Sequence, residues 1–406
     1  MKKIYSLLFC ILITHLFYTA EAELNAGGYY KNFFTAYKSK YTNEPLMSAV
    51  VNRLRLNLSY APTNTFSLNL AYDFAPRVQD PSLFSQSSFA VGVASSKYRI
   101  SDFDSQLYPS ESELVGNVGI YHNLDRASMQ FSTSFADITI GRDAIAWGSA
   151  RTINPTDVIA PYTYDQLDTE DRVGVDAIRI RIPVGVLGEI DTGYVIGSNF
   201  NFDKSAVFLR TQLNAAETDY SILLLEYQRD LLIGLDVTRG IGGAGFWLET
   251  AYVFPEVFAD ETKESDNYLR SSIGFDYSFN GETYAFIEYH FNGAGVTKPE
   301  DFLENIEQPA YYRGSVYLLG VHYLAPGVTH QFTPLISCSG QMLFNLNDTS
   351  AWFVSQIGYN IAEDIHISVG GLFSIGIPLK EDDTTQYQSE FGAYPNLFFS
   401  SFWIYF

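Results

Sequence analysis

Segments in which apolar and polar residues alternate recur along most of the chain, and each is about ten residues long. The clearest examples lie at residues 53–60, 66–74, 177–182 and 270–279. In the first of them, Leu56 and Leu58 alternate with Arg55 and Asn57. Because successive side chains of a strand point to opposite faces, each segment predicts a β-strand with one apolar and one polar face.

Eighteen strands are expected from this pattern, near residues 26–37, 49–60, 66–75, 124–134, 136–146, 173–183, 188–198, 204–213, 219–228, 231–241, 245–254, 268–279, 282–292, 312–324, 328–345, 351–360, 365–376 and 397–406. With the N-terminus in the periplasm, the connections on that side are short: residues 61–65, the turn near Phe135, 183–188, 214–218, 242–244, 280–281, Pro326-Gly327 and 362–364. The opposite side receives every long connection: residues 76–123, 147–172, 255–267, 293–311 and 378–396.

This one-sided distribution of long loops is typical of outer-membrane barrels, as is an even number of strands. A soluble β-sandwich shows the same local alternation, with its apolar face in a core. The segments, however, approach the roughly 9–11 residues that a tilted membrane strand needs. The expected fold is therefore all-β: a transmembrane, antiparallel, up-and-down β-barrel of about 18 strands (16–18), forming one domain over residues 23–406.

Residues 1–22 have the order of a secretory signal peptide. A basic start precedes an apolar stretch over residues 4–18, and residues 20–22 read Ala-Glu-Ala, a small-x-small cleavage pattern. The alternative, a membrane anchor, needs roughly 20 apolar residues, more than this stretch supplies. Since Cys10 leaves with the signal peptide, Cys338 is alone and no intramolecular disulfide is expected.

The last segment, residues 397–406, is apolar and aromatic and ends in Phe406. Phe402 and Ile404 fall on the same face of this strand as Phe406. The segment resembles the C-terminal signal strand of bacterial outer-membrane proteins, which the barrel-assembly machinery reads. The expected location is therefore the bacterial outer membrane, crossed many times, with this machinery, lipid and lipopolysaccharide as partners.

Composition narrows the other partners. The chain has 46 acidic and 25 basic residues, a formal charge of −21, so a nucleic-acid partner is not expected. Its 29 Tyr, 31 Phe and 4 Trp suit an all-β protein. The mature chain has no candidate transmembrane helix, because its most apolar stretch, residues 222–235, is interrupted by Glu226, Arg229 and Asp230.

Signals for catalysis are weak. The six histidines form no H-E-x-x-H or H-x-x-E-H zinc pattern, and no G-x-S-x-G elbow occurs. We therefore expect no catalytic residues, no metal site, no cofactor and no enzymatic activity. Because a catalytic set can come from different strands, His290 near Glu288 and His366 near Ser368 stay as loose candidates.

If the apolar face meets lipid, the polar face lines the lumen, since a charge on the lipid face costs about 2–4 kcal/mol near the midplane. A barrel of this size with a polar lining leaves room for a water-filled channel. The candidate pore-lining residues are Arg53, Arg55, Asp73, Arg179, Arg181, Arg210, Glu226, Asp236, Arg270, Asp276 and Glu288.

Two arginine pairs at alternate strand positions form short basic ladders: Arg53 with Arg55, and Arg179 with Arg181. They have two open interpretations. They line a constriction that attracts carboxylate or phosphate groups, or they pair with carboxylates of the lumen and loops and stiffen the barrel. Locally they favour anionic or polyol-rich solutes, against an overall acidic field that favours cations.

Residues 141–157 are the most distinctive segment, with a strand that ends at an interfacial tryptophan, then a glycine and an Asn-Pro-Thr-Asp turn. The residues that carry the pattern are Arg142, Trp147, Gly148, Asn154, Pro155 and Asp157. The segment resembles the "GRQ-x-I-x-W-G … N-P-x-D" segment of Gram-negative porin-like barrels, although Asp143 replaces the usual Gln. The upstream Asn-Leu-Asp-Arg of residues 123–126 fits the same pattern.

That family is similar to alginate-export and other 18-stranded substrate channels, so the resemblance implies transport. It also suggests that the loop after Trp147 folds inward and narrows the pore; a purely structural turn is the alternative.

The expected function is an outer-membrane channel (porin) for passive or substrate-selective diffusion of small hydrophilic solutes. Two alternatives stay open: an outer-membrane enzyme of the lipase or protease type, and an adhesin or structural barrel that acts through its loops. Acidic runs at residues 260–266 and 381–383 either bind divalent cations that bridge lipopolysaccharide or are simply solvated.

Overall fold

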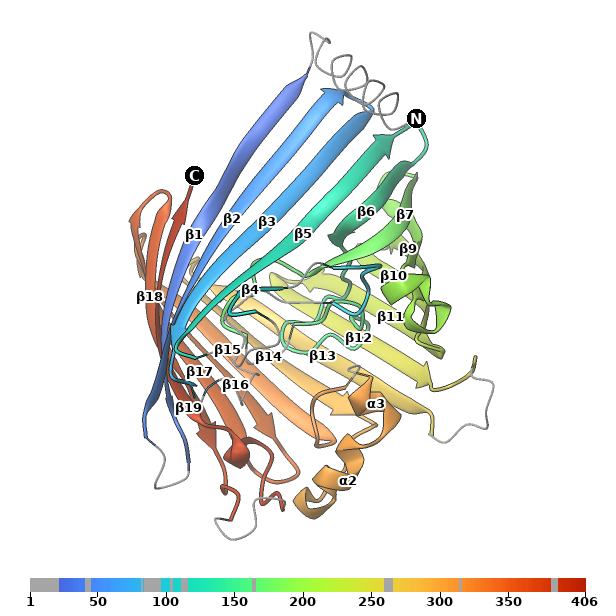
Figure 1. Ribbon diagram of the computed structural model, residues 1–406. Helices are drawn as coiled ribbons and strands as arrows, with labels where there is room; N and C mark the ends of the chain where they lie inside the picture. Colours follow the sequence, from blue (N-terminus) through green and yellow to red (C-terminus); the bar gives the residue numbers. More distant parts are fainter. Residues whose placement is uncertain are drawn as a thin grey trace.

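The computed structural model describes residues 22–40, 45–81, 83, 96–102, 105–110, 116–162, 166–258, 266–313, 316–380 and 386–406. The expected signal peptide therefore lies outside the described residues, apart from Ala22. The rest of the described chain is a closed antiparallel β-barrel, so the predicted fold class is confirmed (Figure 1). Among the described residues, no helix combines the length and the hydropathy of a membrane span.

The barrel wall contains eighteen of the nineteen described strands: β1 (Glu23–Lys38), β2 (Met47–Thr63), β3 (Phe66–Gln79), β5 (Val118–Ser132), β6 (Asp137–Ala144), β7 (Gly174–Val184), β8 (Gly188–Val195), β9 (Ala206–Ala215), β10 (Thr218–Tyr227), β11 (Asp230–Ile241), β12 (Ala244–Phe254), β13 (Tyr268–Phe279), β14 (Thr283–Asn292), β15 (His322–Thr333), β16 (Ile336–Asn345), β17 (Ala351–Ala362), β18 (Ile365–Ile375) and β19 (Asn396–Tyr405). The remaining elements are short: β4 (Gln106–Tyr108), α2 (Phe302–Ile306), α3 (Pro309–Tyr312), η2 (Ser198–Phe200), η3 (Phe202–Lys204), η4 (Pro299–Asp301) and η5 (Phe391–Ala393).

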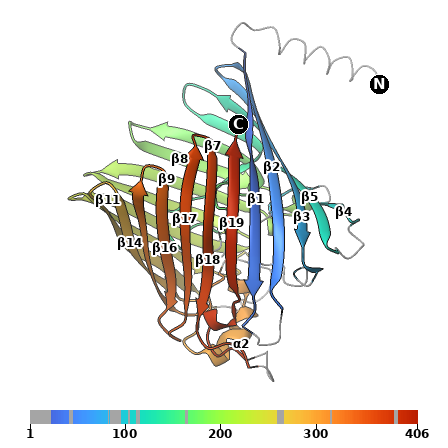
Figure 2. The ribbon, with the colours of Figure 1, turned by 90° about the vertical axis from the view of Figure 1, so that its left-hand side faces the viewer.

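The barrel closes between its first and last strands, which lie side by side in Figure 2. Their register runs from Tyr29 opposite Tyr405 to Lys38 opposite Asn396. Next to the Tyr29–Tyr405 pair, Gly28 N–H donates to the Phe406 carbonyl oxygen over 2.8 Å, and Phe406 N–H donates to the Gly28 carbonyl oxygen over 3.0 Å. Closure leaves the first and last strands without an open edge, which a membrane-spanning sheet requires.

The alternation of faces is confirmed along the strands. On β2, Leu56 is 49% exposed whereas Arg55 is 2% exposed, and on β13 Phe275 is 49% exposed whereas Arg270 is 3% exposed. Exposed apolar side chains thus form the outer face, and charged side chains turn inward. The one-sided loops are also confirmed: the start of β1, the end of β19 and the short turns lie at one end of the barrel, and α2 lies at the other (Figure 2).

The strands near Pro326 were predicted wrongly. The sequence suggested a turn at Pro326-Gly327, but both residues lie inside β15, and the turn is at Pro334-Leu335. The pairing of β15 with β16 is interrupted at Pro326, which has no N–H to donate. At Gly327, the ring of Phe286 takes the place of a side chain: an added Cβ would lie 2.2 Å from it. Tertiary packing therefore keeps this Pro-Gly pair in a strand.

The interior is fuller than a simple water-filled channel. Inward apolar side chains of β8–β12, among them Val195, Phe208, Leu223 and Leu225, belong to one buried cluster with residues of the loops. In the same region, β6 pairs with β5 only as far as Ala127, and β4 covers part of the remaining edge of β5. The loops therefore pack inside the barrel against its wall.

Candidate channel constriction

The described residues of the connection between β6 and β7, 145–162 and 166–173, lie in the barrel interior, and we call them the inner loop. Its first residues are buried: Ile145 is 1% exposed, and the ring of Trp147 packs edge-on against Phe208 of β9 with centroids 4.8 Å apart. Val158 and Ile159 belong to the same buried cluster. In Figure 1, coil segments of this loop and of the region around β4 are visible between the barrel walls.

Glu249 of β12 holds the start of the inner loop. Its carboxylate accepts backbone N–H groups of Ser149 and Ala150, both at 3.0 Å, and of Thr156 at 2.8 Å. It also accepts the Thr156 hydroxyl at 2.7 Å and the Asn154 amide at 3.0 Å. This buried carboxylate thereby satisfies N–H groups of a turn that has no strand partner.

Glu288 of β14 holds the next residues in the same way. It accepts the backbone N–H groups of Arg151 at 2.7 Å, Thr152 at 3.3 Å and Ile153 at 3.0 Å. The indole N–H of Trp247 donates to the same carboxylate at 3.0 Å. Glu288 is 1% exposed, so these contacts are shielded from water.

Two further wall carboxylates complete this attachment. The Ser149 hydroxyl donates to Asp236 of β11, and the Arg151 guanidinium lies 3.0 Å from a carboxylate oxygen of Asp276 on β13. The structure thus brings together three predicted residues, Asp236, Asp276 and Glu288. Glu249 was missed, although its position was readable: it follows Trp247 by two in the alternation of β12.

Gly148 allows the sharp turn that brings the loop to Glu249. Its φ is +106°, a conformation that residues with a Cβ rarely adopt. A Cβ there would lie 2.6 Å from both carboxylate oxygens of Glu249. Asn154 supports the same turn by donating to the Ala150 carbonyl at 3.1 Å, and Pro155 is buried beside it. Residues of the distinctive segment therefore shape the turn that Glu249 binds.

The end of the inner loop is attached to the other wall by ion pairs. Lys31 of β1 lies 2.8 Å from Asp168 and 2.5 Å from Glu170. Arg53 of β2 lies 3.0 Å from Asp168, and the hydroxyl of Tyr29 donates to Asp171 at 2.6 Å. Because Lys31 is fully buried, this pairing compensates a charge that water cannot reach.

Most of the basic ladders are engaged in pairs. Arg53 and Arg55 both bind Asp73, at 3.0 and 3.1 Å, and Arg55 also binds Asp125 at 2.9 Å. Arg179 binds Asp191 at 2.7 Å. These contacts favour the interpretation in which ladder arginines stiffen the barrel.

The other predicted pore-lining arginines, Arg179, Arg181, Arg210 and Arg270, do not gather in one cluster. Asp191 also accepts the Trp147 indole at 3.3 Å, so the Arg179 pair holds the inner loop as well. Among the described residues, Arg181 makes no ion pair. Arg210 donates to Gln212 at 3.0 Å, and Arg270 is buried on the inner face of β13.

Glu226 does not face the lumen, which corrects its prediction. On β10 it shares the outer face with Ile222 and Leu224, whereas Leu223 and Leu225 are buried. Glu226 lies near the end of its strand, where it accepts the Arg229 N–H at 3.3 Å. The polar end of the strand tolerates a carboxylate that the middle would not.

A second segment, residues 96–102, packs beside the inner loop. Arg99 donates to the Gly174 carbonyl at 2.9 Å and to Asn123 at 2.6 Å. Asp102 lies 3.0 Å from Arg142, which also binds Asp176 at 2.8 Å. Arg142 of the distinctive segment therefore ties this second segment to β6 and β7.

A cavity of about 540 Å³ remains between the inner loop and the wall of β14–β19. Its lining combines polar, aromatic and aliphatic residues: Ala150, Arg151, Thr152, Asn154, Tyr162, Gln166, Leu167, Thr169, Arg172, Phe286, Val328, Thr329, Ser339, Gly340, Gln341, Leu343, Trp352, Val354, Gln356 and Phe399. None of these residues is acidic, and both arginines already have partners: Arg151 has Asp276, and Arg172 has Asp157.

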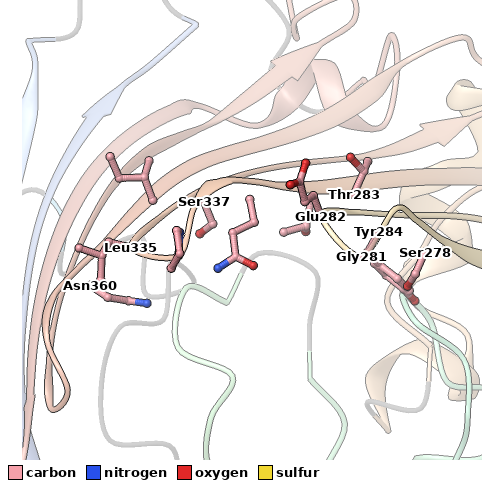
Figure 3. A pocket seen from close by; sticks show the side chains of 12 residues that line it. Ser278, Gly281, Glu282, Thr283, Tyr284, Leu335, Ser337 and Asn360 are labelled. Atoms are coloured by element: carbon pink, nitrogen blue, oxygen red, sulfur yellow. The ribbon is translucent and has the colours of Figure 1, made fainter.

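A second cavity of about 320 Å³ lies at the periplasmic end, between the turns that follow β13 and β15 (Figure 3). Serine, threonine and amide side chains line it, among them Ser337, Thr283 and Asn360, with Glu282 as its acidic residue. Thr329 lines this cavity and the larger one, so the two lie next to each other along β15.

The loose catalytic candidates do not form an accessible set. Ser272 and His290 lie 2.8 Å apart, but Ser272 donates to the Ile153 carbonyl, and both are at most 2% exposed. In the second predicted pair, His366 contacts Asn360 at 2.7 Å, and the Ser368 hydroxyl is hydrogen-bonded to the Ser401 hydroxyl at 2.6 Å. Within the described part of the chain, no three His, Cys, Asp or Glu residues are grouped to hold a metal. The acidic runs at 260–266 and 381–383 lie outside the described residues, apart from Asp266.

No protein-family model and no curated protein matches the sequence. Solved structures do match over nearly the whole chain. Acinetobacter baumannii OccAB1 is 10% identical, with 96% of this chain and 97% of that chain covered and a TM-score of 0.55. Pseudomonas aeruginosa OccD3 (OpdP) is 9% identical, with 96% and 92% covered and a TM-score of 0.55.

The P. aeruginosa outer membrane protein OpdK is 8% identical, with 95% and 98% covered and a TM-score of 0.55, and it has also been solved with vanillate. At these identities the likeness establishes a shared fold, the antiparallel barrel of eighteen wall strands.

Proposed function

We propose that this chain is an outer-membrane channel, and that small hydrophilic solutes diffuse through it past the inner loop. The observation that carries the proposal is the attachment of one loop to two facing parts of the wall. Carboxylates of β11–β14 hold residues 149–156, and cations of β1 and β2 hold residues 168–171. Such a loop narrows a wide barrel without closing it, because a polar cavity remains beside it.

The neighbouring folds support the same proposal, since they belong to outer-membrane channels of the Occ and Opd types, one of them solved with vanillate. In this proposal residues 141–157 begin the loop that folds inward and narrows the pore, as their resemblance to the segment of porin-like barrels suggests. Export by residues 1–22, assembly through the strand that ends in Phe406, and contact with lipid and lipopolysaccharide belong to it as well. The chain is proposed to have no enzymatic activity, because Ser272 and His290 are buried and engaged.

The test is reconstitution of the purified, folded chain into planar bilayers in potassium chloride. We expect discrete conductance steps in the open state. A folded barrel that inserts yet conducts at no voltage contradicts the channel proposal. Phospholipid or peptide hydrolysis that His290→Ala abolishes would support the enzyme alternative instead.

A further inference from the structure

The last five wall strands differ from the rest of the barrel in charge. β15, β16, β17, β18 and β19 contain no Asp, Glu, Lys or Arg, in contrast to β1, β2, β11, β12, β13 and β14. The inward positions of β15–β17 carry amides and hydroxyls instead, including Thr329, Ser339, Gln341 and Gln356. One side of the barrel interior is therefore polar but uncharged.

The inner loop leaves its open space on this uncharged side. Its strong contacts are to the charged strands: Glu249 and Glu288 at one end, Lys31 and Arg53 at the other. Among the described residues, its bond to β16 is neutral and runs from the Gln341 amide to Thr152 at 3.0 Å, and the hydroxyl of Tyr405 on β19 donates to Glu170 at 2.8 Å. The larger cavity lies here, and its volume is within the roughly 300–1,000 Å³ of small-molecule sites.

The cavity combines two kinds of surface. Amides and hydroxyls both donate and accept hydrogen bonds, as the hydroxyls of a polyol do. The rings of Phe286, Trp352 and Phe399 add flat apolar surface beside them. The arginines of the lining, Arg151 and Arg172, are already paired with carboxylates. A charged solute would lose hydration here without meeting an uncompensated opposite charge.

The amide and hydroxyl side chains continue along β15–β17 toward the periplasm, and we call this row of side chains the polar track. Thr329 is shared with the second cavity, where Gln331 extends the same chemistry along β15. Ser337 of β16 and Asn360 of β17 line the same cavity (Figure 3). Each of these side chains offers hydrogen bonds without a formal charge. A solute that leaves the larger cavity therefore meets amides and hydroxyls again, with Glu282 as the acidic residue of the second cavity.

We propose that the track along β15–β17 selects uncharged, polyhydroxylated solutes of saccharide or polyol type. The inference rests on the proposed channel function and names its substrate class. Solute hydroxyls exchange water for the amides and hydroxyls of the track, and the C–H faces of the solute pack on the aromatic rings. Matched acids of the same size are disfavoured.

The test measures block of the potassium chloride current by glucose and by glucuronate, which share a ring and differ by one carboxylate. We expect saturable block by glucose and at least severalfold weaker block by glucuronate. Gln341→Ala and Gln356→Ala should each weaken the glucose block about tenfold, as expected for one lost hydrogen bond. Gln130→Ala is the matched control: Gln130 is an inward glutamine of β5 outside both cavities, and its loss should leave the block unchanged.

A complementary variant is Gln356→Lys, which adds an unpaired cation to the track and should reverse the preference toward glucuronate. Stronger block by glucuronate in the unaltered protein, or an equal loss of block in Gln130→Ala, overturns the inference while the conductance steps leave the channel proposal standing. Absence of conductance in every variant and in the unaltered protein overturns both.

Discussion

Glu249 is the residue on which the constriction depends most. Its carboxylate is fully buried and accepts three backbone N–H groups, from Ser149, Ala150 and Thr156. Each N–H left unsatisfied in such a place costs about 1–3 kcal/mol. Removing the Glu249 carboxylate leaves these three N–H groups without the acceptor that they have in the structure.

We therefore expect Glu249→Ala to detach the first part of the inner loop and to increase single-channel conductance. Glu249→Gln should have a smaller effect, since one oxygen still accepts. The control is Glu226→Ala, which removes a carboxylate from the outer face of a nearby strand and should leave conductance unchanged. Equal conductance in Glu249→Ala and the unaltered protein would show that the loop does not limit the current.

Asp157 gives the constriction a dependence on pH. It is 2% exposed, and burial raises the pKa of its carboxyl to about 6, with Arg172 acting in the opposite direction. The folded state thus favours the protonated form, and this contribution to stability is lost as pH rises through about 6. Below that pH the carboxyl is neutral, and Arg172 in the cavity lining keeps an uncompensated charge.

The ratio of anion to cation permeability should therefore rise as pH falls from 8 to below about 6. Reversal potentials in a salt gradient measure this ratio. Asp157→Asn should show at pH 8 the ratio that the unaltered protein shows only in acid. A pH dependence that persists unchanged in Asp157→Asn would assign it to another group.

At the scale of elements, the connection between β18 and β19 is tied to its neighbours by Glu390. This fully buried carboxylate accepts the Leu319 N–H at 2.8 Å and the Asn345 amide at 2.7 Å, together with the Tyr323 hydroxyl. Asp348 accepts the Glu390 N–H at 2.6 Å. The connection is therefore packed onto the loops before β15 and after β16.

Burial raises the pKa of Glu390 to about 7, above its ordinary value of 4.5. The stability that this shift contributes is complete below the ordinary value and is lost as pH rises through about 7. Hydrogen exchange at the Leu319 amide, corrected for its intrinsic pH dependence, should therefore be slower at pH 5 than at pH 9. Glu390→Gln should flatten this dependence, and Glu300→Gln, which alters an exposed glutamate, should not.

At the scale of the whole molecule, one part of the barrel wall holds the inner loop and another part borders the space open to solutes. Charged strands hold the inner loop through paired groups, and the uncharged strands β15–β19 border the open space. A pore wall needs polar groups that are not already engaged, and buried ion pairs are rigid because each partner depends on the other. The separation places rigidity and solute contact on different strands.

The periodicity of the sequence was sufficient to predict the fold class. The alternation at Leu56 and Phe275 predicted strand faces correctly, and the long connections identified one end of the barrel. It failed at Pro326, where a local turn signal lost to pairing with β14, and at Glu226, where a charge on the outer face was read as lining. In the first case the pairing with a neighbouring strand determines where the turn lies. In the second case the position near the strand end allows a charge on the outer face.

The sequence by itself determined the barrel, because a period of two makes each strand amphipathic, and membrane strands have one apolar face. Only the tertiary structure decided that residues 145–162 and 166–173 enter the barrel, and which walls they meet. Arg53 and Asp168 are 115 residues apart, and nothing in either local pattern names the other. Closing the sheet brings them within 3.0 Å, so the constriction is a property of the closed barrel.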